Sequence, residues 1–261
     1  MGGYKQYPPS VLLECSLEKE ALSELLDKAV EAIRVLRRDG ARVHSITNTV
    51  AQNFTANVLL ACNTKPSMTV NPDEVETFIS RADALHINLG TLDAGRIEAI
   101  NKSVLKANQS SIPILLDPVM VHVSPSRAEF AGKIMDKVNI IRGNKSEIQT
   151  LGIEHEASPC IVMTGQCDKI FFKEASLNIQ NGHPIMSNVI ATGCALGALI
   201  TALSSKTDCP VCASLAGLLW FGIAGEMAAQ KHKNPGSFSP AFIDSLYEVD
   251  LDTLHDKAKL S

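Results

Sequence analysis

An excess of charge of one sign is absent from this sequence. Its 261 residues contain 24 lysines and arginines and 28 aspartates and glutamates, which gives a formal charge of −4. Proteins that bind nucleic acid or anionic membranes concentrate basic residues, so this balance argues against both kinds of partner. The hydrophobic fraction of 45% and the charged fraction of 20% are ordinary for a folded enzyme. We therefore expect a small-molecule ligand.

Long hydrophobic runs are also absent. The apolar, uncharged stretch from Cys209 to Gly225 opens with a proline and falls short of the roughly 20 residues that a membrane span needs. We predict a buried helix there. The first ten residues lack the charged-then-apolar order of a signal peptide, so we expect a cytoplasmic protein. The seven cysteines are odd in number and irregularly spaced, which favours reduced thiols over a disulfide framework.

The common nucleotide-binding fingerprints are missing. The sequence contains neither GxxxxGK[ST] nor GxGxxG after a strand, which argues against a P-loop NTPase and a Rossmann dehydrogenase. One dithiol motif, Cys209-Pro-Val-Cys212, is present, but no second pair supplies the remaining ligands of a zinc site. The motif also follows a helix rather than the first strand of a thioredoxin-like unit. A cysteine-based redox or hydrolytic protein is therefore an alternative with little support.

Strand and helix patterns alternate along the first part of the chain. Short apolar runs predict strands at 42–46, 67–70, 84–87, 112–116, 138–141 and 160–163. Apolar residues at helical spacing predict helices at 16–40, 51–61, from 71 onward, 93–108, 127–137 and 144–151. This alternation indicates an α/β fold with a mostly parallel central sheet and helices on both faces. We expect residues 1–261 to form a single domain.

The pattern changes after Leu151. Only about ten residues separate this helix from the next strand, too few for a full covering helix, so we expect a short crossover or an edge pairing. Runs at 169–172, 177–180 and 184–186, punctuated by Asn181-Gly182, predict a small antiparallel section. Apolar helices are then expected at 193–203 and 211–230, followed by a shorter one near 240–247.

A candidate anion site lies where Ala191-Thr192-Gly193-Cys194 enters an apolar helix. The first N–H groups of a helix have no partners within the helix, and the helix dipole makes this end positive. Such an end can hold a phosphate. A glycine at a helix start can equally be there only because the backbone turns easily at glycine. This feature alone leaves both interpretations open.

Eight short motifs occur together and in one order. They are His44-Ser-Ile-Thr-Asn48, Asn53-Phe-Thr-Ala-Asn57, Pro66-Ser-Met68, Asn88-Leu-Gly-Thr91, Leu116-Asp-Pro-Val119, Ile141-Arg-Gly-Asn144 followed by Glu147, Met163-Thr-Gly165 and Pro235-Gly-Ser-Phe238. In this order they resemble the motifs of the hydroxyethylthiazole kinase family, within the ribokinase-like superfamily. The resemblance spans roughly residues 42 to 247. It implies a ribokinase-like fold and ATP-dependent phosphorylation of the hydroxyl of 4-methyl-5-(2-hydroxyethyl)thiazole, a step of thiamine salvage.

The resemblance also assigns roles residue by residue. It implies ATP binding by Arg142, Thr164 and Asn144, and Mg²⁺ placement by Glu147 and Asp117, since carboxylates suit this hard cation. It implies a homotrimer with substrate pockets between subunits, where Asn48 and Met68 face the boundary. Ala191 and Gly193 are the corresponding residues of the anion loop.

Cys194 takes the position where most ribokinase-like enzymes carry an aspartate base. The resemblance therefore implies that its thiolate accepts the proton of the substrate hydroxyl. Because a helix N-terminus lowers the pKa of a thiol, we expect that thiolate to be accessible. A buried, inert thiol is the alternative, since free cysteine is among the most buried residue types.

Three departures from the family pattern bear on activity. Ile190 and Ala191 replace a threonine and a glycine of the anion loop. Met120 and His122 replace a glycine-rich stretch after Asp-Pro-Val. The connection after Leu151 lacks a helix-sized segment. Two further readings therefore stay open, namely a ribokinase-like kinase of hydroxymethylpyrimidine or pyridoxal, and a thiazole- or nucleotide-binding protein with a weakened site.

Overall fold

A computed structural model describes residues 19–153, 159–173 and 175–261. Its centre is an eight-stranded sheet with the order β2-β1-β3-β4-β5-β6-β7-β8. Neighbouring strands from β2 to β6 are parallel, whereas β7 and β8 are antiparallel. The expected mostly parallel α/β sheet with an antiparallel section in the C-terminal half is confirmed. The strands are β1 (Ala41–Ile46), β2 (Thr64–Ser67), β3 (Ala84–Asn88), β4 (Ile114–Asp117), β5 (Ile140–Asn144), β6 (Cys160–Thr164), β7 (Asp168–Phe172) and β8 (Ala175–Ile179).

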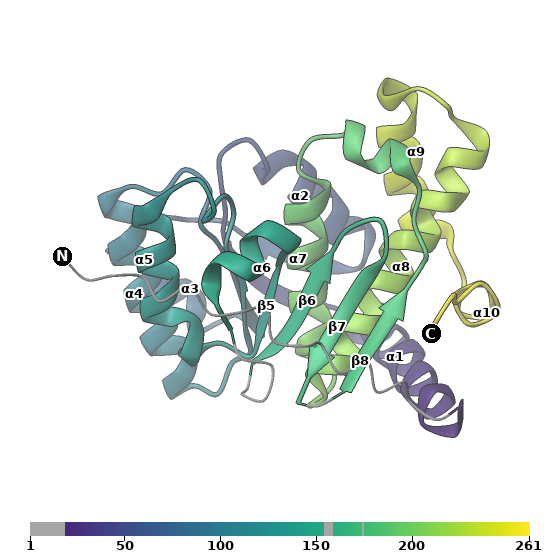
Figure 1. The fold of residues 1–261 in the computed structure, drawn as a ribbon. Helices are drawn as coiled ribbons and strands as arrows, with labels where there is room; N and C mark the ends of the chain where they lie inside the picture. The colour runs from purple at the N-terminus through teal and green to yellow at the C-terminus, as the bar shows by residue number, and fades with distance from the viewer. Residues whose placement is uncertain (1–18, 154–158, 174) are drawn as a thin grey trace.

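Helices cover both faces of the sheet (Figure 1). One core cluster joins the sheet to α1 (Lys19–Asp39), α2 (Gln52–Ala61), α7 (Thr192–Ser204), α8 (Pro210–Lys231) and α9 (Pro235–Glu248). The second cluster lies under α3 (Val75–Ile79), α4 (Ala94–Gln109), α5 (Pro125–Ile134) and α6 (Lys145–Leu151). Short helices η1 (Met135–Lys137), η2 (Pro184–Asn188) and α10 (Leu251–Asp256) complete the described elements.

Helix α8, together with its N-cap residue Cys209, contains the apolar, uncharged stretch Cys209 to Gly225. It is long and apolar enough to pass a composition test for a membrane span, yet 83% of its most apolar window is buried inside the protein. Trp220 at its middle is fully buried and donates its indole N–H to the carbonyl of Leu246 at 2.9 Å. The predicted buried helix is therefore confirmed.

The edge strand β2 lies three residues earlier than predicted. The sequence predicts a strand at 67–70, which begins just after Pro66. The structure pairs Thr64 to Ser67 with Ala41 to His44 of β1, and β2 stands at the end of the sheet. An edge strand tolerates proline because one side of its backbone has no partner strand.

The antiparallel section contains one wrong prediction. Residues Pro184 to Asn188 form the short helix η2 rather than a strand. His183 caps this helix by accepting the N–H of Ile185, and Pro184 occupies the first helical position, where a missing N–H costs nothing. The outer edge of β8 pairs instead with the C-terminal residues, because Asn178 and Ser261 exchange two backbone hydrogen bonds of 2.8 and 3.1 Å.

Two boundaries near the chain ends differ from the prediction. Residues 16–18 of the first predicted helix lie outside the described residues, and α1 ends at Asp39 before Gly40, whose φ of 68° confirms it as the stop. Helix α9 begins at Pro235, five residues before the predicted start, and carries Pro240 in its interior. Pro240 has no N–H to donate to the carbonyl of Gly236, so one interior hydrogen bond of the helix is missing there.

Candidate active site

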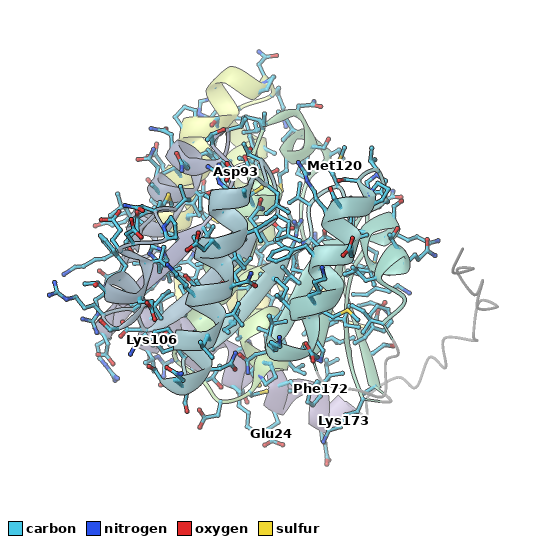
Figure 2. All side chains as sticks on the ribbon, turned by 90° about the vertical axis from the view of Figure 1, so that its left-hand side faces the viewer. Glu24, Asp93, Lys106, Met120, Phe172 and Lys173 are labelled. Carbon is cyan, nitrogen blue, oxygen red and sulfur yellow. The ribbon has the colours of Figure 1, made fainter. Side chains whose placement is uncertain are left out.

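The carboxyl ends of the parallel strands meet at one edge of the sheet, and polar side chains collect there. Asn88 ends β3, Asp117 ends β4 and Thr164 ends β6, while Asn48 follows β1. In Figure 2, Asp93 and Met120, which follow β3 and β4, stand at the upper edge, and Lys106 near the end of α4 stands at the lower one. Ligands of open α/β sheets gather at this carboxyl edge.

Asn88 is the centre of a hydrogen-bonded cluster. Its side-chain amide donates to Asp117 Oδ2 at 2.9 Å and to Cys194 Sγ at 3.2 Å. Its carbonyl oxygen accepts from the Asn48 amide at 3.1 Å and from the backbone N–H of Gly90 at 3.0 Å. Asn48 also donates to Cys194 Sγ at 3.4 Å. Two amides therefore hold the thiol in place.

Asn88 begins one of the eight motifs, but the family resemblance assigns it no role. Strand β3 is buried at every position, including Asn88. A polar side chain that ends a fully buried strand needs a partner, since an unpaired amide in the interior is costly. That position was the signal by which Asn88 could have been found.

Helix α7 brings its N-terminus to the same edge and carries Cys194 in its first turn. The residue before the helix, Ala191, adopts a left-handed conformation with φ of 71° and has no side-chain oxygen with which to cap the helix. Nothing from Ala191 therefore competes for the first N–H groups of α7, which point toward the cluster with the positive end of the helix dipole. This arrangement suits an anion.

The guanidinium of Arg142 lies against this helix end. An added Cβ at Gly193 would stand 2.8 Å from both terminal nitrogens of Arg142, so only glycine admits this approach. Arg142 Nη2 donates to Thr164 Oγ1 at 2.9 Å, and Nη1 lies 3.5 Å from Asp117 Oδ2. The arginine and the helix dipole together create a positive site next to the Cys194 thiol.

Burial controls the ionisation of the cluster. It raises the pKa of Asp117 to about 6, against the opposing effect of Arg142. It also raises the pKa of the Cys194 thiol to about 11, and the neighbouring Asp117 carboxylate adds to this increase. The expectation that the helix N-terminus makes this thiolate readily available is therefore wrong, because burial and the charge of Asp117 outweigh the hydrogen bonds from Asn48 and Asn88 and the positive charge of Arg142.

Asn144 and Glu147 lie beside the cluster and bond to each other. Asn144 Oδ1 accepts the N–H of Glu147 at 3.0 Å, and Glu147 Oε2 accepts the N–H of Asn144 at 2.8 Å, which is a capping box at the start of α6. The second carboxylate oxygen of Glu147 accepts the N–H of Met120 at 2.9 Å. Glu147 therefore joins the loop after β4 to the end of β5.

Comparisons with known proteins show the family of this chain. A sequence model of the hydroxyethylthiazole kinase family matches residues 33–158 and 153–252. A probable hydroxyethylthiazole kinase of Agrobacterium fabrum is 37% identical over 234 residues, which covers 89% of this chain and 94% of that protein. The chain belongs to the hydroxyethylthiazole kinase family.

Two solved structures place the fold. The hydroxyethylthiazole kinase of Pyrococcus horikoshii superposes with a TM-score of 0.85 at 34% identity, over 90% of this chain and 98% of that one. A ribokinase-like superfamily protein of Enterococcus faecalis superposes with a TM-score of 0.60 at 14% identity, over 86% and 93% of the two chains. The second likeness is one of fold alone, and both agree with the predicted ribokinase-like architecture.

Most residues that the family resemblance singled out come together in this structure. Asn48, Asp117, Arg142, Thr164, Gly193 and Cys194 form one cluster. Met68 lies past the end of β2 and is half-buried, and within the described part of the chain it makes no hydrogen bond to the cluster. Its predicted contact with substrate stays a prediction.

Among the residues that depart from the family pattern, Met120, His122 and Ile190 are exposed and Ala191 is half-buried. Ile190 is 70% exposed, and Met120 is 44% exposed with φ of 61°. Met120 therefore adopts the left-handed backbone that glycine adopts without cost. Its backbone N–H donates to Glu147 Oε1 at 2.9 Å.

Proposed function

We propose that the protein transfers the γ-phosphoryl group of ATP to the hydroxyl of 4-methyl-5-(2-hydroxyethyl)thiazole. The observation that carries the proposal is the Cys194 thiol held by Asn48 and Asn88 beside the positive site of Arg142 and the α7 N-terminus. Phosphoryl transfer asks a protein mainly for positioning and charge neutralisation. This cluster supplies a cation, helix N–H groups and a proton acceptor within one hydrogen-bonded unit.

The roles follow from the chemistry of each side chain. The unpaired N–H groups of Gly193 and Cys194 and the Arg142 guanidinium would bind phosphate oxygens, because a planar guanidinium and a helix end both favour anions. Thr164 orients the guanidinium through its 2.9 Å hydrogen bond. The Asn48 and Asn88 amides fix the Cys194 sulfur where an alcohol oxygen in line with the phosphate would meet it.

Proton transfer from the alcohol would go to Cys194. With a pKa of about 11, the thiol is mostly protonated near neutral pH, and the small thiolate fraction is a strong base. The hydroxyl oxygen forms the new bond to phosphorus, the bond from phosphorus to the β–γ bridging oxygen breaks, ADP leaves, and the proton ends on the thiolate. A loose transition state lets the proton transfer follow the phosphoryl group, since little charge builds on the attacking oxygen.

The residues present fit a Mg²⁺ ion. Asp117 Oδ1 is buried and has no hydrogen-bond partner in the described part of the chain, so one carboxylate oxygen remains for an ion or its water. Both oxygens of Glu147 already accept backbone N–H groups. Glu147 would therefore contact the ion through a bound water rather than coordinate it directly. Mg²⁺ commonly uses one or two carboxylates together with substrate phosphates, and it would neutralise phosphate charge here.

A substrate panel tests the proposal. ADP formation would be measured with Mg·ATP and hydroxyethylthiazole, hydroxymethylpyrimidine, pyridoxal or a sugar. We expect the thiazole to be preferred and EDTA to abolish turnover. Preference for another alcohol would reassign the protein to a different ribokinase-like kinase. ADP formation that is unchanged in EDTA would refute the role of the metal. Binding of the thiazole without turnover would indicate a weakened site.

Assembly into a homotrimer with shared substrate pockets is part of the same proposal. Apolar side chains on and before α2 support it, because Val50 is 60% exposed and Leu60 is 58% exposed. Val50 precedes the start of α2 and Leu60 lies near its end, and large exposed apolar side chains of this kind are candidates for contact with another subunit. Asn48 precedes this segment, so a subunit that covers it would stand near the Cys194 cluster.

A further inference from the structure

The motif Cys209-Pro-Val-Cys212 forms the start of α8, the longest of the described helices. Cys209 is the N-cap residue, and its sulfur accepts the backbone N–H of Cys212 at 3.1 Å. Pro210 occupies the first helical position, where its fixed φ favours the helix and its missing N–H has no cost. The two cysteines are therefore held at one helical turn by the geometry of a helix cap.

The two thiols differ in their surroundings. Cys209 is half-buried and within reach of solvent, whereas Cys212 is fully buried. The hydrogen bond from the Cys212 thiol, aided by the backbone N–H groups of Cys212 and Val211, lowers the pKa of Cys209 to about 6. The pKa of Cys212 is raised by the same partnership and by burial. Near neutral pH this arrangement pairs an accessible thiolate with a protonated thiol behind it.

This pair lies at the opposite edge of the sheet from Cys194. Cys160, the first residue of β6, places its sulfur 3.8 Å from Ser214 Oγ in the first turns of α8. The last residue of β6, Thr164, bonds to Arg142 in the phosphate site. The dithiol is thus separated from the Cys194 cluster by the length of a strand, and the kinase chemistry has no use for it.

We propose that Cys209 and Cys212 form a redox-active dithiol that reduces low-molecular-weight disulfides and is thereby oxidised to an intramolecular disulfide. The Cys209 thiolate attacks one sulfur of the small disulfide, forms a mixed disulfide and releases one thiolate, which takes up a proton. Cys212 then loses its proton and attacks Cys209 Sγ, which forms the Cys209–Cys212 bond and releases the second small thiol. Two electrons pass from the protein to the small disulfide, and the proposal is independent of the proposed kinase activity.

The described surroundings favour exchange over metal binding. Among residues 19–153, 159–173 and 175–261, no group of three or more His, Cys, Asp or Glu side chains could hold a metal ion. Reactivity in exchange follows the thiolate fraction and access to solvent. Burial raises the pKa of Cys160 to about 12 and that of Cys194 to about 11, so neither competes with Cys209 near neutral pH.

The pH dependence of the alkylation rate tests whether Cys209 is a thiolate near neutral pH. The parent is the full chain with Cys15→Ser and Cys167→Ser, and iodoacetamide is the probe. We expect one thiol whose alkylation rate rises with a midpoint near pH 6, and we expect this reactive thiol to be absent from Cys209→Ser. In Cys212→Ala the midpoint should rise, because the sulfur loses its hydrogen-bond donor. A midpoint that stays the same in Cys212→Ala, or a fast thiol that survives Cys209→Ser, would overturn the assignment.

Reaction with glutathione disulfide tests the exchange. The parent should lose two titratable thiols without keeping an adduct, and peptide mapping should find a Cys209–Cys212 bond. Cys212→Ala and Cys212→Ser should each retain one glutathione, because no second thiol resolves the mixed disulfide. Cys209→Ser should neither form an intramolecular disulfide nor retain glutathione. ADP formation in Cys209→Ser should stay within about twofold of the parent, given the separation of the sites. An adduct retained by the parent, or none in either Cys212 variant, would refute the dithiol.

Discussion

Cys194 is held under two opposing influences. The helix end and two amides favour its thiolate, while burial and the Asp117 carboxylate disfavour it and raise its pKa to about 11. If the thiolate accepts the hydroxyl proton, activity must rise with pH, since the acceptor is the deprotonated form. The pH dependence of kcat therefore reports directly on this residue.

Replacement of Cys194 gives the first prediction. Cys194→Ala should lower kcat by about 10²–10⁴, the usual effect of losing a general base. Cys194→Asp should retain activity, and its kcat should level off near neutral pH, whereas the parent rises into the alkaline range because its acceptor has a raised pKa. Steady-state ADP release from pH 6 to 10 measures both. An alanine variant within about threefold of the parent would make the thiol a packing group.

Asp117 gives the second prediction. Asp117→Asn should lower the pKa of Cys194, because it removes a neighbouring negative charge and leaves the positive charge of Arg142 uncompensated. The pH dependence of Cys194 alkylation measures the shift. Asp168→Asn is the control, since Asp168 is half-buried and also has a pKa raised to about 6, but it is not among the charges that act on Cys194. An equal midpoint in Asp117→Asn and parent would contradict the argument.

The loop that leads into α7 stores strain at Ala191, whose φ is 71°. Ala191→Gly should stabilise the protein by about 1 kcal/mol, because a left-handed conformation costs a non-glycine residue about 1–2 kcal/mol and the more flexible unfolded chain offsets part of the gain. The expected rise in Tm is about 2–4 °C. Ala195→Gly, inside the same helix, should instead destabilise by about 1 kcal/mol. Thermal unfolding of both variants checks the contrast, which a lower Tm for Ala191→Gly would refute.

Glu147 connects two loops through its hydrogen bonds to Met120 and Asn144. This structural role can be measured separately from a role in placing the metal. Glu147→Ala removes the acceptor of two backbone N–H groups, from Met120 and Asn144, and should cost about 2–3 kcal/mol even in EDTA. Urea unfolding without metal measures it. Glu129→Ala, which removes an exposed ion pair with Lys133, should change stability by less than about 0.5 kcal/mol. A purely metal-placing Glu147 would leave the metal-free stability unchanged.

The proposed trimer gives a prediction for the assembly. Leu60→Glu places a charge in the exposed apolar segment near α2 and should dissociate the trimer, which is expected at three times the subunit mass of 28.0 kDa. Leu105→Glu is the control, because Leu105 is equally exposed, at 61%, on α4. Light scattering distinguishes the two variants. A monomeric parent with full activity would remove both the trimer and the shared pocket.

The order of strands and helices across the molecule could be read from the sequence because it depends on local periodicity. Buried parallel strands such as β3 are continuous apolar runs, and helices such as α1 carry apolar residues at helical spacing. The strand predicted at Pro184 was wrong because its outcome depends on distant residues. A short apolar run occurs equally in a strand and in a short helix, and the edge of β8 pairs instead with Ser261, which is remote in sequence.

The site divides in the same way. The motifs at the carboxyl ends of β4, β5 and β6 and at the start of α7 were recognisable one by one, and parallel strands bring such ends to one edge without further information. The partners of each side chain were not recognisable. Nothing adjacent to Asn88 in the sequence reveals that its amide bonds to Cys194, 106 residues away.

Family membership and the parallel sheet therefore followed from residue types and their spacing, which are properties of the linear chain. The ionisation of Cys194, the attachment of Glu147 to Met120 and the pairing of Cys209 with a buried Cys212 followed only from the folded chain. The physical reason is that a pKa or a hydrogen bond depends on the charges, donors and solvent within a few ångströms of an atom. Tertiary packing chooses those neighbours from distant parts of the sequence, and local patterns carry no record of that choice.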